Sequence, residues 1–298
     1  MTLKNWLLVI RTPFLLLSCT LVFLGGALAL YTGIINTFNV ILALIGLLLL
    51  HISVNVLNEY YDYKFGTDFL TKKTPFSGGS GVLPAGLINP SKVLLLGLIS
   101  FSIAAVIGIY FLYTVGTLLI PILVLGAIFT LLYTQFLARC MLGEISAGLG
   151  LGTLPILGVF IVATGEITLE AVAISIIPGI TTFNLLLLNE FPDVEADKVT
   201  GRKNLVTQFG YEKCSKIYSI LLILLYIYLF ILIVLKVAPP YLFIAYLTLP
   251  LANKNIKILM RKFTQEELLY AMKNNTILTL TIPTLLAIGY IIATITLQ

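Results

Sequence analysis

Charged residues are scarce in this chain. They make up 10% of its 298 residues, whereas soluble domains carry roughly a quarter. Hydrophobic residues account for 59%, and the mean hydropathy is +1.06. This composition excludes an ordinary soluble domain and indicates an integral membrane protein. The excess of Lys and Arg over Asp and Glu, 18 to 13, is typical of membrane topology signals and does not suggest binding to nucleic acid.

Cysteine, histidine and tryptophan are also rare. Cys19, Cys140 and Cys214 stand singly, and none forms a pair at the spacing of a metal or redox motif. They predict no site and are interpreted as small packing residues. The single histidine, His51, is interpreted as a buried, hydrogen-bonded side chain rather than a base, and Trp6 as an interfacial anchor.

Apolar runs of membrane-spanning length recur along the chain. We expect a single all-α transmembrane domain, residues 1–298, with nine helices in one bundle around a central cavity. The expected helices cover residues 7–31, 38–57, 93–113, 116–137, 143–163, 168–188, 214–236, 239–258 and 275–297. Prolines interrupt the eighth. The first run has no small-residue cleavage site with a soluble domain behind it, so we expect a helix rather than a signal peptide.

The basic residues predict the orientation of this bundle. With nine spans, the N-terminus and the loops after helices 2, 4, 6 and 8 share one side, which collects 17 of the 18 Lys and Arg residues and leaves only Lys236 opposite. Basic residues in short loops stay in the cytoplasm. We therefore expect a protein of the cytoplasmic membrane with a cytoplasmic N-terminus and an external C-terminus.

Seven of the 13 acidic residues occur in two short windows that resemble each other. Asn58-Glu-Tyr-Tyr-Asp62 is followed by Asp68, and Asn189-Glu-Phe-Pro-Asp193 is followed by Asp197. Both windows follow apolar runs that end on the expected cytoplasmic side, four helices apart. The repeat predicts a parallel duplication, with helices 1–4 and 5–8 as pseudo-equivalent halves and the two motifs facing each other across the cavity.

The spacing within the first motif predicts where its side chains point. If the second helix continues through the motif, one face carries His51, Asn55, Asn58 and Asp62. Gly66 then indicates that the chain has left the helix, with Asp68 folding back.

The second motif has a similar spacing but contains a proline. Asn189, Asp193 and Asp197 recur every four residues, which would place them on one helix face. Pro192 removes a backbone donor, so we expect the helix to bend or end there.

Clustered carboxylates and amides beside a cavity indicate a divalent cation. These groups are hard oxygen donors that suit Mg²⁺, which also takes oxygens from a substrate phosphate. Two such clusters predict Mg²⁺ at two or more sites, holding a diphosphate. Basic residues after the motifs agree with this prediction: Lys72, Lys73, Lys198, Arg202 and Lys203. Aromatic residues interleave with the acids and would stabilise a cation formed there by about 0.5–2 kcal/mol per contact.

The two motifs resemble the aspartate-rich motifs of the UbiA superfamily of intramembrane prenyltransferases. The resemblance extends to the basic residues after the second motif and to nine helices, so it covers essentially the whole chain. It implies an enzyme that holds an Mg²⁺-bound isoprenyl diphosphate in a central cavity. The enzyme would transfer the prenyl group to a second, lipophilic and often aromatic, substrate in the membrane.

The resemblance also implies roles for individual residues. The catalytic residues would be Asn58, Asp62, Asn189 and Asp193. The metal ligands would be Asn58, Asp62 and Asp68 at one site and Asn189, Asp193 and Asp197 at the other. The candidates for diphosphate binding are Lys198, Arg202, Lys72 and Arg139. Tyr133 resembles the family's tyrosine near the reacting carbon, and Arg11 and Glu144 are candidate contacts to the acceptor.

The first motif departs from the commonest family form. It has Glu59 where many members have Asp, and Asp68 lies ten residues past Asn58 rather than eight. This longer form resembles the branch that prenylates dihydroxynaphthoate in menaquinone synthesis, so we expect a quinone precursor as acceptor. A geranylgeranylglyceryl phosphate acceptor, as in ether-lipid synthesis, stays open, and so does hydroxybenzoate.

A cation-coupled transporter that uses the acids as ion sites is the main alternative. It predicts charges near the bilayer midplane, whereas both motifs lie at helix ends. It also leaves the paired motifs and the trailing basic residues unexplained.

Overall fold

Helices make up the regular structure in the computed structural model, which describes residues 2–297. In lipid every backbone N–H and C=O needs a partner within the protein, and a helix supplies one for each. The longer helices are α2 (Leu16–Tyr31), α3 (Thr37–Phe65), α5 (Pro90–Thr114), α6 (Ile120–Leu132), α8 (Leu154–Thr164), α9 (Leu169–Asn189), α11 (Leu205–Val234), α12 (Leu249–Leu259) and α13 (Gln265–Leu297). Shorter elements are α1 (Leu3–Ile10), η1 (Thr12–Leu15), α4 (Thr67–Leu70), η2 (Thr117–Leu119), η3 (Leu137–Arg139), α7 (Gly143–Gly148), η4 (Leu149–Thr153), α10 (Val194–Thr200) and η5 (Pro240–Thr248).

Seven helical segments among the described residues are long and apolar enough to cross a membrane. They coincide with seven of the nine expected spans. The fourth expected span is shorter, Thr117–Leu132. The eighth is composite: a 3₁₀ segment, η5, precedes the 11-residue α12. The all-helical membrane architecture is thus confirmed, and the count of nine stays a prediction.

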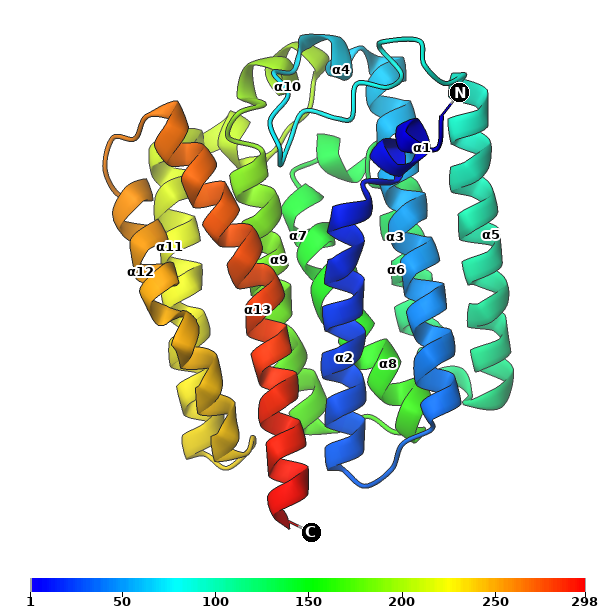
Figure 1. Cartoon of the computed structure of the whole chain (residues 1–298), viewed down its shortest axis with the longest axis vertical. Coiled ribbons are helices and arrows are strands. Elements are labelled where there is room, and N and C mark those ends of the chain that lie inside the picture. The colour runs from blue at the N-terminus through cyan, green and yellow to red at the C-terminus, as the bar shows by residue number, and fades with distance from the viewer. Residues whose placement is uncertain (1, 298) are drawn as a thin grey trace.

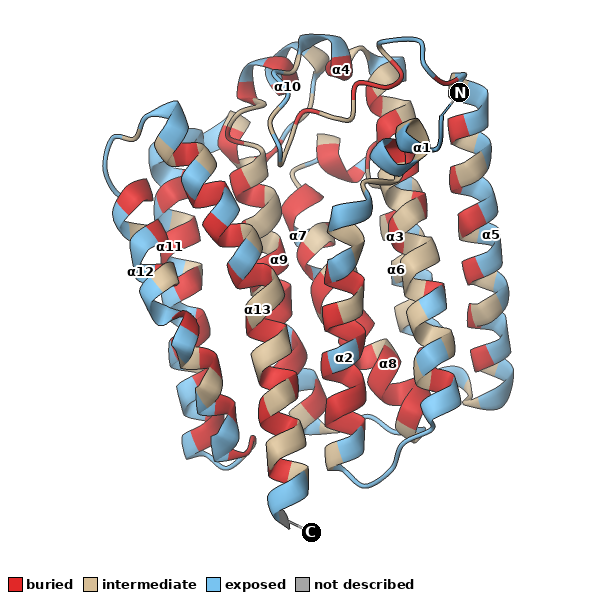
Figure 2. Cartoon of the chain, in the orientation of Figure 1, coloured by how far each residue is buried: buried red, intermediate tan, exposed pale blue. Residues whose placement is uncertain are grey.

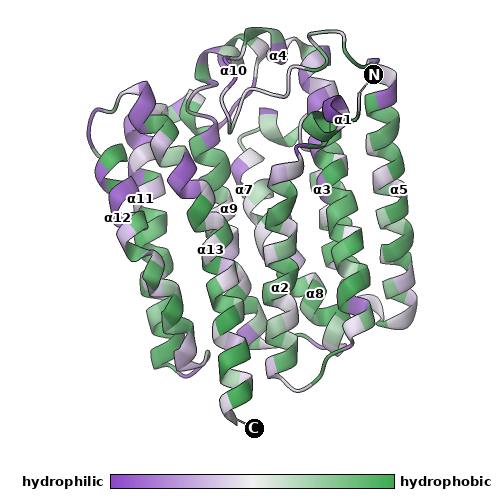
Figure 3. Ribbon diagram, viewed as in Figure 1, coloured by the Kyte–Doolittle hydropathy of each residue, from purple (hydrophilic) through white to green (hydrophobic). Residues whose placement is uncertain are grey.

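The ends of α3 and α9, where the acidic motifs lie, are at the same end of the bundle. Figure 1 shows α4 and α10, which follow these helices, side by side there with the N-terminus. The C-terminus lies at the opposite end. This relative placement agrees with the expected topology. In Figure 3 the strongly hydrophilic segments gather at the motif end, and the shafts of the helices are hydrophobic.

Large apolar side chains cover the outside of the bundle. On α5, Leu95, Ile99, Val106 and Ile109 are all exposed, and Figure 2 shows exposed residues along its outer side. Exposed apolar area on this scale would cause aggregation in water. In a bilayer it is the surface that contacts the acyl chains.

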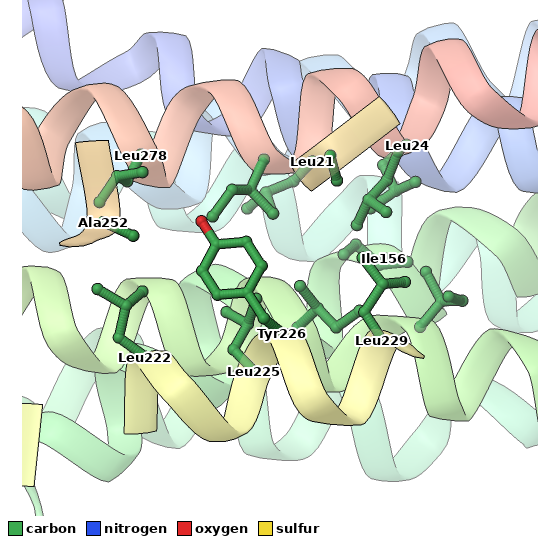
Figure 4. Close-up of a cluster of buried hydrophobic side chains, with 14 of the residues drawn as sticks. Leu21, Leu24, Ile156, Leu222, Leu225, Tyr226, Leu229, Ala252 and Leu278 are labelled. Carbon is green, nitrogen blue, oxygen red and sulfur yellow. The ribbon is translucent and has the colours of Figure 1, made fainter. Parts of the chain in front are cut away.

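The interior between α2, α8, α9, α11, α12 and α13 is packed with apolar side chains. Figure 4 shows Leu21, Ile156, Tyr226 and Leu278 from four of these helices converging in this cluster. Polar groups also cross-link the helices: the Tyr218 hydroxyl donates to Asn275 Oδ1 at 2.8 Å and accepts from Asn255 Nδ2 at 3.0 Å. Such interhelical hydrogen bonds fix helix positions where lipid offers no hydrophobic driving force.

Glycines allow α7 and η4 to approach α9 to backbone contact. A Cβ on Gly152 would lie 2.6 Å from Gly179 Cα, and one on Gly148 would lie 2.8 Å from the Gly179 carbonyl oxygen. Small residues permit this kind of close crossing in membrane bundles. Leu151, in the π-helical turn η4, has φ −120° and ψ 33° and bends the chain there. The crossing holds one wall of the cavity described below.

We expect Gly152→Ala to destabilise the fold by about 1–3 kcal/mol, because the added methyl group would push against the α9 backbone. Thermal unfolding of the detergent-purified protein measures this. Gly158→Ala is the matched control, since its nearest new contact, Ile122 Cγ2, would lie at 3.5 Å. Equal midpoints for the two variants would show that the crossing does not limit stability.

Candidate active site

A cavity of about 250 Å³ extends from the two acidic motifs toward the middle of the bundle. Its polar end is lined by Arg11, Asn58, Asp62, Asp68, Asn189, Glu190, Asp193, Asp197, Arg202 and Asn204. Its apolar part is lined by Leu47, Leu50, Val54, Phe129, Leu151, Leu185 and Leu280. Leu47 lies about 22 Å along α3 from Asp62, at 1.5 Å per residue. The cavity therefore combines an ionic mouth with a long apolar extension.

The first motif is presented on a continuous helix. α3 runs through it to Phe65, and His51, Asn55, Asn58 and Asp62 all line the cavity, as the expected stripe required. Gly66 ends the helix with φ 83°. The chain then turns into α4, so Asp68 also lines the cavity.

The second motif is presented on a broken helix. α9 ends at Asn189, a turn containing Pro192 follows, and α10 begins at Val194. This agrees with the expectation that the proline ends the helix. Asn189, Asp193 and Asp197 nevertheless all line the cavity, because the turn redirects the chain without removing these side chains from the site.

Arg202 connects the two motifs. Its Nη2 donates to both carboxylate oxygens of Asp62, at 2.8 and 3.0 Å, and its Nη1 lies 3.7 Å from Asp197 Oδ1. Asn204 Nδ2 donates to the other Asp197 oxygen at 2.8 Å. The adjacent carboxylates raise the pKa of Arg202 against the effect of its burial. The predicted convergence of the motifs on one cavity is confirmed, with a guanidinium between them.

Asn58 is the centre of the first motif's hydrogen bonds. Its Nδ2 donates to Asp62 Oδ2 at 2.9 Å and to Thr134 Oγ1 at 3.0 Å. Its Oδ1 accepts from Arg11 Nη2 at 3.3 Å. Arg11 has φ 56°, a left-handed conformation that is unfavourable for a non-glycine residue. This conformation lets α1 turn into η1 and directs the guanidinium at the motif.

Glu59 anchors the 71–81 loop, which follows α4 and covers the site. Its side chain is fully buried and accepts from the Ser80 backbone N–H at 3.1 Å and from the Ser80 hydroxyl. Arg11 lies 3.4 Å from the same carboxylate. Residues 77–79 of this loop line the cavity. The glutamate that distinguishes this motif therefore holds the loop and does not line the cavity.

Several buried oxygens in the cavity lack a hydrogen-bond donor. Among the described residues these are Asp68 Oδ2, Asn189 Oδ1, Glu190 Oε2, Asp193 Oδ1 and Asp197 Oδ1. Unsatisfied buried acceptors are costly, and a hard cation satisfies carboxylate and amide oxygens. Within residues 2–297 no three His, Cys, Asp or Glu side chains converge closely enough to define a metal position, and Arg202 contacts carboxylates of both motifs. The donor set fits Mg²⁺, and the role of these oxygens as metal ligands stays a prediction.

The acids outside the spans have raised pKa values. Burial, with the nearby charges of Glu59 and Asp62, raises the pKa of Asp68 to about 8. Burial and the charge of Asp197 raise the pKa of Asp193 to about 7. Burial also raises the pKa of Asp197, opposed by Arg202. A nearby cation would favour the ionised form of each group.

Four of the predicted binding residues do not line this cavity. Lys198 is half exposed and pairs with Glu195 at 3.2 Å. Arg139 lies over the Phe65 ring, 4.0 Å from its centroid. Glu144 is buried and accepts from the Leu205 backbone N–H at 2.6 Å, which ties α7 to the start of α11. Lys72 borders a second cavity.

The remaining predicted residues, Arg11, Tyr133 and Arg202, do line the cavity. His51 is buried, and Ser18 Oγ lies 2.9 Å from its Nδ1, as expected for a hydrogen-bonded histidine.

The sequence interpretation missed Thr134 and Asn204. Asn204 caps α11 in a reciprocal arrangement with Thr207. An Asn three residues before Thr at a helix start was the available signal.

Known proteins are similar to this chain along most of its length. The model of the UbiA prenyltransferase family matches residues 16–293. The chain is 28% identical to the 1,4-dihydroxy-2-naphthoate octaprenyltransferase of Bacillus subtilis, over 91% of this chain and 87% of that protein. It is 29% identical to the UbiA prenyltransferase domain-containing protein 1 of Dictyostelium discoideum, over 75% of this chain and 69% of that protein.

Two solved structures share the fold. One, from work on digeranylgeranylglyceryl phosphate synthase, aligns with a TM-score of 0.68 at 18% identity, covering 99% of both chains. The other is a UbiA homolog from Archaeoglobus fulgidus bound to DMAPP and Mg²⁺, with a TM-score of 0.59 at 15% identity, covering 98% of both chains.

We expect Glu59→Gln to release the 71–81 loop, because buried hydrogen bonds to a charged group stabilise by about 1.5–3 kcal/mol. Trypsin cleavage at Lys72 and Lys73 in the detergent-purified protein should accelerate at least about tenfold. Glu166→Gln, on an exposed turn at the other end of the bundle, serves as the control. Unchanged cleavage would contradict the anchoring role of Glu59.

Proposed function

Because the chain belongs to the UbiA prenyltransferase family, we propose that it transfers an isoprenyl group from an Mg²⁺-bound isoprenyl diphosphate to a lipophilic aromatic acceptor. The acceptor would be a quinone precursor, reached within the membrane. Since members of this family are enzymes that transfer prenyl groups, the alternative of a cation-coupled transporter is set aside.

One observation carries the proposal. Two acidic motifs, 131 residues apart in sequence, line the mouth of one cavity whose far part is apolar. A diphosphate needs hard cations and basic side chains, and an isoprenyl chain needs a water-free apolar channel. The dihydroxynaphthoate enzyme of Bacillus subtilis, which matches over most of both chains, supports a quinone precursor as acceptor. The longer form of the first motif supports the same choice.

The donor set suggests how Mg²⁺ would be held. Asn58, Asp62 and Asp68 would serve one ion and Asn189, Asp193 and Asp197 another, giving two or more sites. A bound Mg²⁺ supplies Lewis-acid neutralisation of charge on the diphosphate oxygens.

The chain's own residues would then perform the remaining work. Arg202 and Arg11 lie at the polar end and would stabilise the diphosphate as the allylic C–O bond breaks and its electron pair leaves with the diphosphate. Tyr133 and Phe129 line the adjacent wall, and their π faces would stabilise the allylic cation. A ring carbon of the acceptor would form the new C–C bond, and its proton would leave to water.

The proposal also covers the domain and its orientation in the membrane. The whole chain would form one prenyltransferase domain in the cytoplasmic membrane, with the motif end and the N-terminus in the cytoplasm and the C-terminus outside. The basic residues support this orientation, because 17 of 18 belong to the side that carries the motifs.

We expect purified protein to release diphosphate from geranylgeranyl diphosphate when Mg²⁺ and 1,4-dihydroxy-2-naphthoate are both present. Hydroxybenzoate and geranylgeranylglyceryl phosphate, offered in turn, test the other acceptors. Asp62→Ala and Asp193→Ala should each lower turnover at least about 100-fold, because each removes a carboxylate that would hold the Mg²⁺ that neutralises the leaving diphosphate. Turnover with none of the three acceptors, despite diphosphate binding, would exclude the quinone-precursor assignment.

We also expect metal binding to weaken as the pH falls from 8 to 6. The pKa values of about 8 for Asp68 and about 7 for Asp193 mean that both carboxyls hold protons at pH 6, and a metal ion must displace them. Each displaced proton lowers the apparent affinity by up to about tenfold per pH unit. Calorimetric titration with Mn²⁺ at both pH values, in buffers of different ionisation enthalpy, measures the affinity and the protons released. An affinity independent of pH would contradict ligation by these acids.

A further inference from the structure

A second cavity, of about 240 Å³, lies beside the second motif. It is formed by the loop after α4, the turn between α9 and α10, the first turns of α11, and the connection from α12 to α13. The lining residues are Lys72, Thr74, Phe191, Pro192, Tyr211, Phe263, Thr264, Gln265, Leu268 and Leu269. The proposed function gives this cavity no role.

The two cavities share a wall. In the loop after α4, Thr71 and Phe76 line the first cavity, whereas Lys72 and Thr74 line the second. In the second motif, Asp193 lines the first cavity and its neighbour Pro192 the second. Because neighbouring residues face different cavities, a single layer of chain separates the second cavity from the acids of the first.

The second cavity is walled by flat apolar groups. Phe191 is buried, and its ring centroid lies 5.4 Å from that of Tyr211 and 6.1 Å from that of Phe263. The Tyr211 hydroxyl donates to the Phe191 carbonyl at 3.3 Å, which fixes the tyrosine ring. Leu268 is buried on the α13 side. Such walls accommodate an aromatic ring, which prefers offset or edge contacts with other rings.

Lys72 supplies one positive charge at this cavity. Among residues 2–297 no carboxylate lies within ion-pair distance of it, whereas Lys198 in α10 and Arg261 between α12 and α13 pair with Glu195 and Glu267. One ammonium group complements one carboxylate. A phosphate, with higher charge and more oxygens, is usually held by several basic groups or a bidentate arginine, and this cavity has neither.

We propose that the second cavity binds an aromatic carboxylic acid, the acceptor substrate, with Lys72 pairing with its carboxylate and Tyr211 and Phe263 packing on its ring. This inference rests on the proposed function and names the place where the acceptor is first held. The acid is first held there, outside the metal-binding oxygens, and would have to pass the 71–81 loop to reach the diphosphate in the first cavity, where transfer takes place. Lys72, a sequence candidate for diphosphate binding, is thus reassigned to the acceptor.

The test is direct binding without turnover. 1-Hydroxy-2-naphthoate, a stable fluorescent acid, is titrated into the full-length protein in detergent without Mg²⁺ or isoprenyl diphosphate. Lys72→Ala and Phe263→Ala should each raise its Kd about tenfold, the loss of one ion pair or one ring contact. Lys262→Ala, exposed and next to Phe263 but outside the lining, should leave the Kd unchanged. Circular dichroism and gel filtration check that each variant is folded.

Competing ligands distinguish the possible occupants. 2-Naphthol, which lacks the carboxylate, should bind more weakly than the acid and respond to Phe263→Ala but not to Lys72→Ala. Inorganic diphosphate and an anionic phospholipid are offered as competitors. If either displaces the acid from the wild-type protein but not from the Lys72→Ala variant, the proposal is overturned in favour of a phosphate site. Asp193→Asn should leave the Kd of the acid unchanged. If the Kd instead changes with Asp193→Asn and not with Lys72→Ala, the acid binds in the first cavity only, and the proposal is overturned.

The inference and the proposed function fail separately. Prenyl transfer to dihydroxynaphthoate with no effect of Lys72→Ala or Phe263→Ala on binding of the acid would overturn the inference and keep the function. Binding of the acid that depends on Lys72 and Phe263, without transfer to any acceptor, would support the site and remove the function.

Discussion

The arrangement of both motifs depends on the positive charge of Arg202, which lies between carboxylates from two distant parts of the chain. Burying Asp62 and Asp197 without a partner would be costly, and the guanidinium contacts both. A short local structure brings it there. Gly201, with φ 76°, ends α10, and the Arg202 backbone N–H donates to the Asp197 carbonyl at 2.9 Å. The cap of a seven-residue helix therefore sets the electrostatics of a motif 140 residues earlier in the sequence.

The parts of the site that depend on local periodicity could be predicted from the sequence. The spacing of His51, Asn55, Asn58 and Asp62 required only that α3 continue, and no proline interrupts the chain between Thr37 and Gly66. Pro192 ends α9 for a reason that is local to its own ring. Scarce charge and long apolar runs were enough to predict a helical membrane bundle, because lipid permits few alternatives.

The parts that depend on tertiary contacts could not be predicted. Lys198 follows Asp197 directly, yet successive residues in a helix point about 100° apart, so Lys198 faces solvent while Asp197 faces the cavity. Glu144 pairs with a backbone group 61 residues away, and the path of the loop after α4 depends on the contact of Glu59 with Ser80. Neither partner is marked by any local pattern. The eighth span also depends on tertiary contacts. The prolines near η5 weaken its helical pattern in the sequence, and its place in the bundle depends on packing against α13.

Arg11 joins the first motif to the lipid surface. The short α1 exposes Leu3, Leu7 and Leu8, as a helix lying in the headgroup layer would, and its last turn leads directly into the residue that donates to Asn58 and Glu59. Because Arg11 directly follows α1 and its guanidinium donates to Asn58, a shift of α1 would also move a hydrogen-bond partner of Asn58. Lipid in contact with the exposed leucines of α1 would thereby act on the first motif through a single arginine.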